Sequence, residues 1–312
     1  MSFTVSRRLF VALAASALMS ASVVAQETRI LSTTFGDVEI PANPQRIVTT
    51  HYIATQPLLD VGVIPVGSGN IDPSNTTYWD ILKDIPVVNS GAEVNIEQIA
   101  ALKPDLIFET NIADEKRIEQ LRQIAPVIII GIRGDDRANW QGRVRQIADA
   151  VNKLPEYDAL EARLEERQAA IKAAHADVLA AERFAAIALW TPGEPVLFTS
   201  NSMSGKILSG AGAIYSDGSE ALKLDNGADV NLSDETLGDA VADASVVLYN
   251  VNLDGTDNAA TAEFKQGPVF KAIPAVAAGK AFPLGKATIA GFGDAFAALD
   301  FFDKTLTALA AK

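Results

Sequence analysis

The feature that most constrains the fold is a long mid-chain segment, residues 156–182, that has neither glycine nor proline and is rich in Ala, Glu, Arg and Leu. Pro155 precedes it, where the first turn of a helix tolerates proline. Apolar side chains recur at every seventh position, at Tyr157, Leu164, Ile171 and Val178. At about 1.5 Å per residue, a helix over this segment would be roughly 40 Å long. Because a small α/β domain needs no helix of that length, the segment predicts a strut between two lobes. The alternative is an ordinary surface helix of one large domain.

Short apolar runs alternate with helical patterns on both sides of this segment. Runs of mostly β-branched or aromatic residues predict buried strands at 46–49, 64–67, 105–108, 127–130, 184–190, 246–249 and 281–284. Helices are predicted at 95–102, at 114–124 and from about Asp294 to the end. The alternation predicts an α/β fold of two Rossmann-like lobes with mostly parallel sheets, joined by one long backbone helix. The predicted boundaries are a signal peptide at 1–25, an N-terminal lobe at 26–153, the interlobe helix at 154–183 and a C-terminal lobe at 184–312.

Composition excludes several classes of function. The 312 residues suffice for two domains, each with its own core. The formal net charge of −13 repels phosphate backbones, so we expect no nucleic-acid partner. The chain has no cysteine, which excludes disulfides, thiolate metal sites, a cysteine nucleophile and a lipid-modified cysteine.

The N-terminus has the pattern of an export signal. Arg7 and Arg8 precede an apolar run at 9–19, and small residues before Gln26 offer a cleavage site. The residues around the two arginines resemble a twin-arginine signal, and a general secretory signal is the alternative. No other run approaches the roughly 20 apolar residues of a membrane span. We therefore expect a periplasmic protein that is not a lipoprotein.

A short pattern occurs once on each side of the strut. Glu97 precedes Asp105 by the same interval as Glu235 precedes Asp243, and each aspartate precedes an apolar run. Asn95 and Ser233 are good N-cap residues before the two glutamates. The repetition favours two similar lobes.

Four further segments resemble the iron-chelate and cobalamin class of periplasmic binding proteins, in which one rigid helix joins two α/β lobes. In chain order they are Phe35-Gly36-Asp37-Val38-Glu39-Ile40-Pro41 with Asn43-Pro44-Gln45-Arg46-Ile47-Val48, then residues 58–67, 95–107 and 270–280. The resemblance runs from about residue 30 to 311 and is weakest at 200–232.

The resemblance implies a monomeric, non-enzymatic component of an ABC importer that binds a ferric siderophore and delivers it to an inner-membrane permease. Haem or cobalamin is the alternative ligand, and a metal-chelate sensor or a secreted enzyme on the same scaffold is the alternative function. In the family, one exposed glutamate on each lobe pairs with permease arginines. By motif and by pseudo-symmetry, these would be Glu97 and Glu235. The simpler interpretation is that first-turn acids complement helix dipoles.

The ligand should lie between the lobes, at the carboxyl ends of the strands. Residues that follow predicted strands or lie in nearby loops are therefore the candidate ligand contacts: His51, Tyr52, Tyr78, Trp79, Glu109, Arg133, Trp190, Tyr249, Asn250 and Lys286. Aromatic faces with a few cations suit an oxygen-rich, often anionic chelate. Each residue could instead be core or solvated, and we expect about half to touch ligand.

Metal coordination and catalysis are not indicated. The chain has two histidines. We expect His175 to be a solvent-facing helix residue and His51 to line the cleft, as a loop residue, a hydrogen-bond partner or an iron ligand. Neither a cofactor nor a protein-built metal site is predicted, since bare metal ions usually need several His or Cys ligands. No nucleophile elbow, phosphate loop or dinucleotide fingerprint occurs. The sequence shows no arginine cluster of the kind expected for catecholates, which favours a hydroxamate, carboxylate or mixed siderophore.

Overall fold

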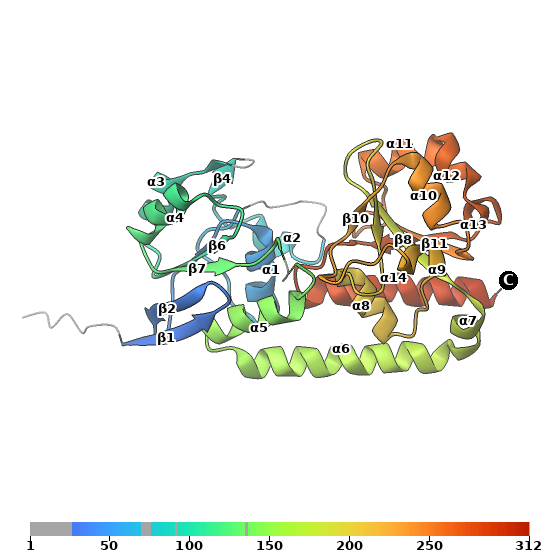
Figure 1. The fold of residues 1–312 in the computed structure, drawn as a ribbon. Coiled ribbons are helices and arrows are strands. Elements are labelled where there is room, and N and C mark those ends of the chain that lie inside the picture. The colour runs from blue at the N-terminus through green and yellow to red at the C-terminus, as the bar shows by residue number, and fades with distance from the viewer. Residues whose placement is uncertain (1–26, 70–75, 91–92, 135–136, 312) are drawn as a thin grey trace, which may run out of the picture.

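The computed structural model describes residues 27–69, 76–90, 93–134 and 137–311 and shows two α/β lobes arranged along one long helix (Figure 1). The predicted signal peptide and the cleavage site before Gln26 lie outside the described residues. Within the described ranges, no helix combines the length and the hydropathy needed to cross a bilayer.

The N-terminal lobe is built on a small parallel sheet with the strand order β3-β6-β7 (β3 Ile47–Thr49, β6 Leu106–Thr110, β7 Val127–Ile130). An antiparallel hairpin precedes the sheet, formed by β1 Thr28–Thr33 and β2 Gly36–Pro41. Two short strands pair beside it, β4 Asn89–Ser90 and β5 Glu93–Val94. The helices of this lobe are α1 Tyr52–Asp60, α2 Trp79–Leu82, α3 Ile96–Leu102, α4 Glu115–Arg122 and α5 Trp140–Ala150.

One strand predicted in this lobe is wrong. Residues 64–67 form no strand; Gly67 makes only an isolated bridge to Val48, and Ser68 one to Val87. Pro65 lies within the predicted run and cannot donate to a ladder, which explains why pairing stays limited to single bridges.

The C-terminal lobe contains a five-stranded sheet with the order β10-β9-β8-β11-β12. The strands are β8 Phe184–Leu189, β9 Pro195–Phe198, β10 Val230–Asn231, β11 Val246–Asn250 and β12 Ala281–Gly285. β8, β11 and β12 pair in parallel. β9 pairs antiparallel with β8 on one side and with β10 on the other. The predicted α/β fold is confirmed, but this sheet is mixed, because β8 turns directly into β9 as a hairpin that the sequence prediction missed. The helices are α8 Met203–Gly210, α9 Asp217–Glu220, α10 Asp234–Ala240, α11 Ala259–Gln266, α12 Pro268–Ala272, α13 Pro274–Ala277 and α14 Phe292–Ala310.

The central helix is shorter than predicted. α6 runs over Leu154–Ala174 and ends at His175, and α7 Ala176–Ala181 follows as a separate short helix. The predicted unbroken helix is therefore wrong at His175, whose backbone leaves helical geometry (φ −123°, ψ 26°). The expectation of a solvent-facing His175 is also wrong. Its side chain is 13% exposed, and its Nε2 lies 2.7 Å from the Asp303 carboxylate of α14.

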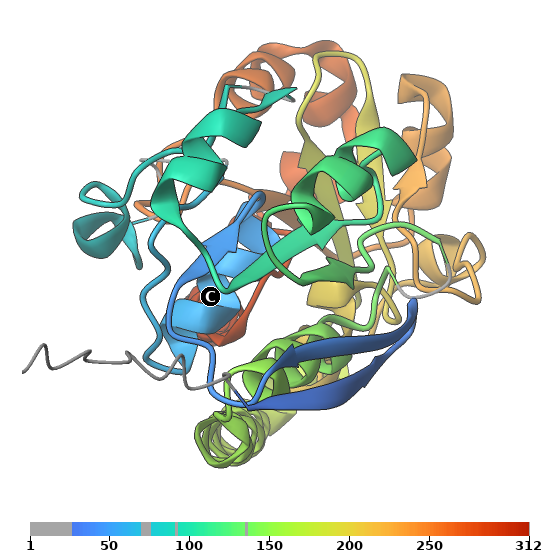
Figure 2. The ribbon, with the colours of Figure 1, turned by 90° about the vertical axis from the view of Figure 1, so that its left-hand side faces the viewer.

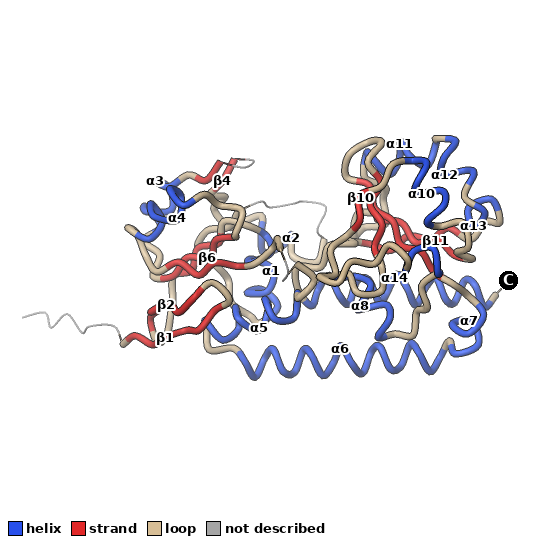
Figure 3. Tube along the Cα trace, in the orientation of Figure 1, coloured by secondary structure: helices blue, strands red, loops and turns tan. Residues whose placement is uncertain are grey.

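α6 and α14 lie side by side; α14 runs beneath the C-terminal lobe from the lobe junction, and α6 extends farther, to α5 of the N-terminal lobe (Figure 3). The apolar stripe of α6 is buried at Tyr157, Leu164 and Ile171, as the spacing predicts. The first residue of α14, Phe292, contacts the rings of Trp140 and Tyr157 at centroid distances of 5.3 and 5.5 Å. The start of α14 therefore lies at the junction of the lobes, where α5 and α6 also meet (Figures 1 and 2). We propose lobe boundaries at 153/154 and 183/184, where α6 and β8 begin.

Candidate ligand-binding cleft

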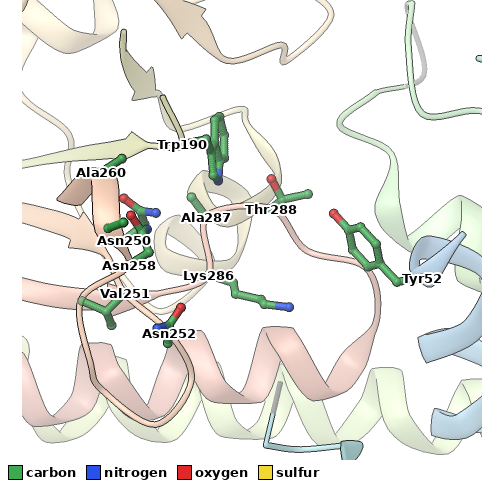
Figure 4. A pocket seen from close by; sticks show the side chains of 11 residues that line it. Tyr52, Trp190, Asn250, Val251, Asn252, Asn258, Ala260, Lys286, Ala287 and Thr288 are labelled. Atoms are coloured by element: carbon green, nitrogen blue, oxygen red, sulfur yellow. The ribbon is translucent and has the colours of Figure 1, made fainter. Parts of the chain in front are cut away.

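Two adjoining pockets lie between the lobes. The first has a volume of about 370 Å³ and the second about 310 Å³. Both are lined by Tyr52, Trp190 and Thr288, and we call the two pockets together the cleft. The lining residues of the first pocket are shown in Figure 4, where Tyr52 of α1 faces the labelled residues of the C-terminal lobe.

The C-terminal wall is made by the segments that follow three neighbouring strands. Trp190 follows β8, Asn250 ends β11 and Lys286 follows β12. Because these three strands are parallel, their carboxyl ends meet at one edge of the sheet, and this edge faces the cleft. Trp190 is 49% exposed and packs edge-on against Phe198 at a centroid distance of 5.8 Å. Its indole is therefore held in place while much of its surface stays available.

Asn250 lines the cleft but has a structural task. It is 5% exposed, and its side-chain amide exchanges hydrogen bonds with the backbone of Leu189, accepting from N–H at 2.8 Å and donating to the carbonyl at 3.3 Å. The Thr261 hydroxyl donates to the same amide oxygen at 3.1 Å. These contacts fix the ends of β8 and β11 together, below the residues that face the cleft.

The N-terminal wall begins at the carboxyl end of β3 with His51 and Tyr52. His51 is the N-cap of α1, and its Nδ1 accepts a hydrogen bond from the Ile53 N–H at 3.3 Å. Burial lowers the pKa of His51 to about 4, so the ring is neutral near pH 7. The Tyr52 ring lies 4.6 Å from that of His51, and the Lys286 ammonium lies 5.6 Å from the Tyr52 centroid. Lys286 and Tyr52 thus make a cation–π contact across the cleft.

Three arginines gather on the N-terminal wall of the second pocket. Arg133 is exposed, whereas Arg143 is 4% exposed and donates to the Arg137 carbonyl at 2.8 Å. Arg137 makes an ion pair with Asp229 at 2.5 Å, which links the N-terminal wall to the loop before β10. Among the described residues that line the two pockets, none is Asp or Glu. The cleft is thus locally basic in a chain whose net charge is −13.

The sequence prediction missed two of these arginines. Arg137 lies in the loop after β7 and Arg143 in the first turns of α5, so neither directly follows a strand. Both face the second pocket because α5 begins close to the end of β7. The arginine cluster that the sequence did not reveal is therefore formed by the fold.

Four predicted ligand residues line neither pocket. Tyr78 is 5% exposed and donates its hydroxyl to Asp60 at 2.5 Å, and Trp79 begins α2 beside it. Glu109 is 2% exposed and lies 4.0 Å from Arg117. Tyr249 packs against Phe270 and beneath the Lys265 ammonium. The other six line the cleft: His51, Tyr52, Arg133, Trp190, Asn250 and Lys286.

Glu97 and Glu235 lie outside the cleft. Both are exposed in first turns, Glu97 in α3 behind the Asn95 cap and Glu235 in α10 behind the Ser233 capping box. The two helices lie on different lobes, on the side of the molecule away from α6 (Figure 1). In the described part of the chain, no three His, Cys, Asp or Glu side chains are placed to hold a metal ion together.

A family model described as periplasmic binding protein matches residues 47–288, which include the strut and most of both lobes. The chain belongs to the periplasmic binding protein family. The resemblance found in the sequence is therefore confirmed.

Relatives of this binding protein agree with the family assignment. The chain is 32% identical over 198 residues to a probable siderophore-binding lipoprotein, YfiY, of Bacillus subtilis, covering 62% of this chain and 59% of the relative. It is 38% identical over 104 residues to an iron(3+)-hydroxamate-binding protein, YxeB, of the same organism, covering 33% and 30%. The chain thus spans less than two thirds of the length of these curated relatives.

A solved structure matches over a larger share. The siderophore periplasmic binding protein from the fuscachelin gene cluster of Thermobifida fusca superposes with a TM-score of 0.71 at 27% identity, covering 86% of this chain and 98% of that one. All three relatives are binding proteins, and this chain is a binding protein and not an enzyme.

Proposed function

We propose that this binding protein captures an anionic ferric siderophore in the cleft and delivers it to an ABC permease. The observation that supports the proposal most directly is the charge of the cleft. Lys286, Arg133, Arg137 and Arg143 line it, and no Asp or Glu does so among the described lining residues. Asp229 neutralises Arg137 from outside the lining, so the remaining positive charge comes from Lys286, Arg133 and Arg143. Since the chain carries a net charge of −13, these cations oppose the mean field and favour an anion in the cleft.

The side chains of the cleft suit the chemistry of a ferric chelate. Carboxylate and catecholate oxygens around Fe³⁺ leave negative charge at the surface of the complex, and guanidinium and ammonium groups bind such oxygens through charge-assisted hydrogen bonds. Tyr52 and Trp190 offer flat apolar faces from opposite lobes. An organic chelate can pack against both faces while its oxygens reach the cations.

The relatives support an iron-siderophore ligand but leave its class open. One is named as hydroxamate-binding, and a ferric tris-hydroxamate carries little or no negative charge. A ferric hydroxamate is therefore the second candidate, favoured by that relative and disfavoured by the cations of the cleft. Haem and cobalamin remain alternatives for the same role.

Tryptophan fluorescence can decide between these ligands. The purified protein would be titrated with ferric citrate, a ferric tris-catecholate, ferrioxamine, haem and cobalamin. We expect saturable quenching by an anionic ferric chelate, since half-exposed Trp190 lies in the cleft, whereas Trp140 is buried and Trp79 lines neither pocket. Trp190→Phe serves as the control and should lose most of the quenching. Saturation by ferrioxamine alone would select the second candidate, and saturation by haem or cobalamin alone would refute a siderophore ligand.

Delivery requires a periplasmic, monomeric protein that meets its permease with both lobes. Glu97 and Glu235 suit this contact because each is exposed and one lies on each lobe. α6 packs against α5 of the N-terminal lobe and against α14 of the C-terminal lobe, so we expect ligand to close the cleft by a small motion. The signal peptide predicted at 1–25 would direct the chain to the periplasm.

A further inference from the structure

The start of α14 is held by a residue from the other lobe. Asp60, the last residue of α1, accepts hydrogen bonds from the backbone N–H of Phe292 at 2.7 Å and of Gly293 at 3.2 Å. These are the first two residues of α14, which have no partner within the helix. Asp60 therefore caps α14 across the lobe junction, 232 residues away in sequence.

No side chain at the N-cap position of α14 can cap the helix, so Asp60 does so instead. The N-cap position of α14 is Gly291, which has no side chain to accept a hydrogen bond. A Cβ at Gly291 would lie 2.2 Å from the Asp60 carboxylate, and one at Gly293 would lie 2.1 Å from the Tyr78 hydroxyl. The two glycines thus allow the carboxylate and the phenol to approach the helix end closely.

Two further groups complete the junction. Tyr78 donates its hydroxyl to Asp60 Oδ1 at 2.5 Å, which orients the carboxyl. Asp294, fully buried in the first turn of α14, accepts from the Ala290 N–H at 3.0 Å. The chain is therefore held at Ala290 from within α14 and at Phe292 and Gly293 from the opposite lobe.

This junction lies directly after the cleft residues Lys286 and Thr288. Residues 286–291 connect β12 to α14. Their first end is fixed because β12 pairs with β11 in the sheet. The position of the segment between these two ends depends on where α14 begins. We propose that Asp60, oriented by Tyr78, is a positioning residue that sets the place of the Lys286–Thr288 wall of the cleft by capping α14 from the opposite lobe. This rests on the proposed function only for the identity of the ligand.

The titration of Asp60 supports a close contact. Burial raises the pKa of the Asp60 carboxyl to about 7, the neighbouring Asp294 carboxyl adds to the rise, and hydrogen bonds from Tyr78, Phe292 and Gly293 oppose it. Burial, together with these carboxyls, raises the pKa of Tyr78 as well, so the phenol keeps its proton for Asp60. Burial and Asp294 thus favour the protonated form of Asp60, whereas the three hydrogen bonds that it accepts favour the carboxylate.

Hydrogen–deuterium exchange on the full chain tests the positioning without any ligand. In Asp60→Ala, we expect backbone exchange over 286–293 to rise about fivefold or more, because a lost cap frees its amides. The matched control is Asp105→Ala. Asp105 also accepts two backbone N–H bonds, from Gln45 at 2.7 Å and Arg46 at 2.8 Å, but within the N-terminal lobe. The Asp105→Ala variant should raise exchange near residues 45–46 and leave exchange over 286–293 as in the wild type.

Affinity for ferric citrate gives the second measurement. Asp60→Ala should bind about fivefold more weakly than Asp105→Ala at equal fraction folded, and Asp60→Asn, whose amide oxygen still accepts an N–H bond, should recover most of the loss. If Asp60→Ala does not fold, Tyr78→Phe replaces it, with the same direction and a smaller change. Exchange over 286–293 equal to that of the control would overturn the proposal, as would equal affinities. If the wild type binds no chelate, the proposed function fails and exchange alone decides the positioning role.

Discussion

Lys286 and Tyr52 face each other across the cleft, so the charge of Lys286 can be tested by itself. We expect Lys286→Met to lower affinity for ferric citrate by about tenfold, because one charge-assisted hydrogen bond to the ligand is lost. Affinity for ferrioxamine should change little, since that complex gains nothing from a cation. Fluorescence titration measures both.

The matched control for this prediction is Lys206→Met. Lys206 is exposed on α8 and lines neither pocket, so its removal makes the same change in net charge away from the cleft. An equal loss of affinity in both variants would show that total charge, and not the Lys286 contact, governs binding.

The raised pKa of Asp60 leads to a second prediction, on the pH dependence of stability. Its pKa in the folded chain is about 7, above the ordinary value of 3.8, so the unfolded chain releases this proton first as pH rises. The stability that Asp60 contributes is therefore complete below about pH 4 and is lost as pH rises through 7. Asp60→Asn cannot ionise, so relative to wild type it should gain about 2–3 kcal/mol in free energy of unfolding between pH 5 and pH 8. Urea unfolding at both values measures this difference. A constant gap between the two proteins would contradict a raised pKa.

At the scale of elements, α6 owes its place to a narrow apolar stripe. Leu164 is 2% exposed in the middle of the helix. We expect Leu164→Ala to lower the free energy of unfolding by about 2–5 kcal/mol, through lost apolar burial and the cavity that remains. Glu165→Ala, on the exposed side of the same turn, should change it by less than about 0.5 kcal/mol. Urea denaturation measures both, and equal effects would show that the stripe does not carry the packing of α6.

Local patterns predicted these elements well where the local chain decides the structure. β7 occupies the predicted 127–130, and the stripe of α6 is buried at three of its four predicted positions. The end of α6 at His175 was missed because its partner, Asp303, lies 128 residues later on α14. Contacts between distant segments leave no local pattern.

The cleft residues were likewise predictable only where the local sequence determines their position. Tyr52 and Trp190 follow parallel strands and line the cleft, as strand ends that share one sheet edge predict; their contact with a ligand stays a prediction. Tyr78 was misplaced because its partner Asp60 cannot be recognised from spacing. Arg143 was missed because only the packing of α5 against the cleft brings it there.

At the scale of the whole molecule, several side-chain contacts join the lobes around the cleft, among them the following three. Arg137 pairs with Asp229, Lys286 lies over Tyr52, and Asp60 caps α14. With α6 beneath, they hold the two lobes at a nearly fixed distance. Exposed groups on the two lobes then keep a constant separation, which would suit the two-point permease contact that we propose.

Glu97 and Glu235 are our candidates for those groups. We expect Glu97→Arg with Glu235→Arg to abolish uptake of radiolabelled iron chelate by cells or proteoliposomes that contain the permease. Ligand affinity should stay within about twofold, because neither residue lines the cleft. Loss of the two favourable helix-dipole contacts should cost about 1 kcal/mol of stability or less at each site.

A charge-matched variant separates docking from these other effects. Glu115 and Asp217 are also exposed first-turn acids, in α4 and α9, one on each lobe. Glu115→Arg with Asp217→Arg makes the same change in net charge and in helix-end charge but alters different surfaces. Uptake should persist in this variant. If both double variants lose uptake equally, net charge explains the loss. If both retain it, the permease contacts lie elsewhere on the lobes.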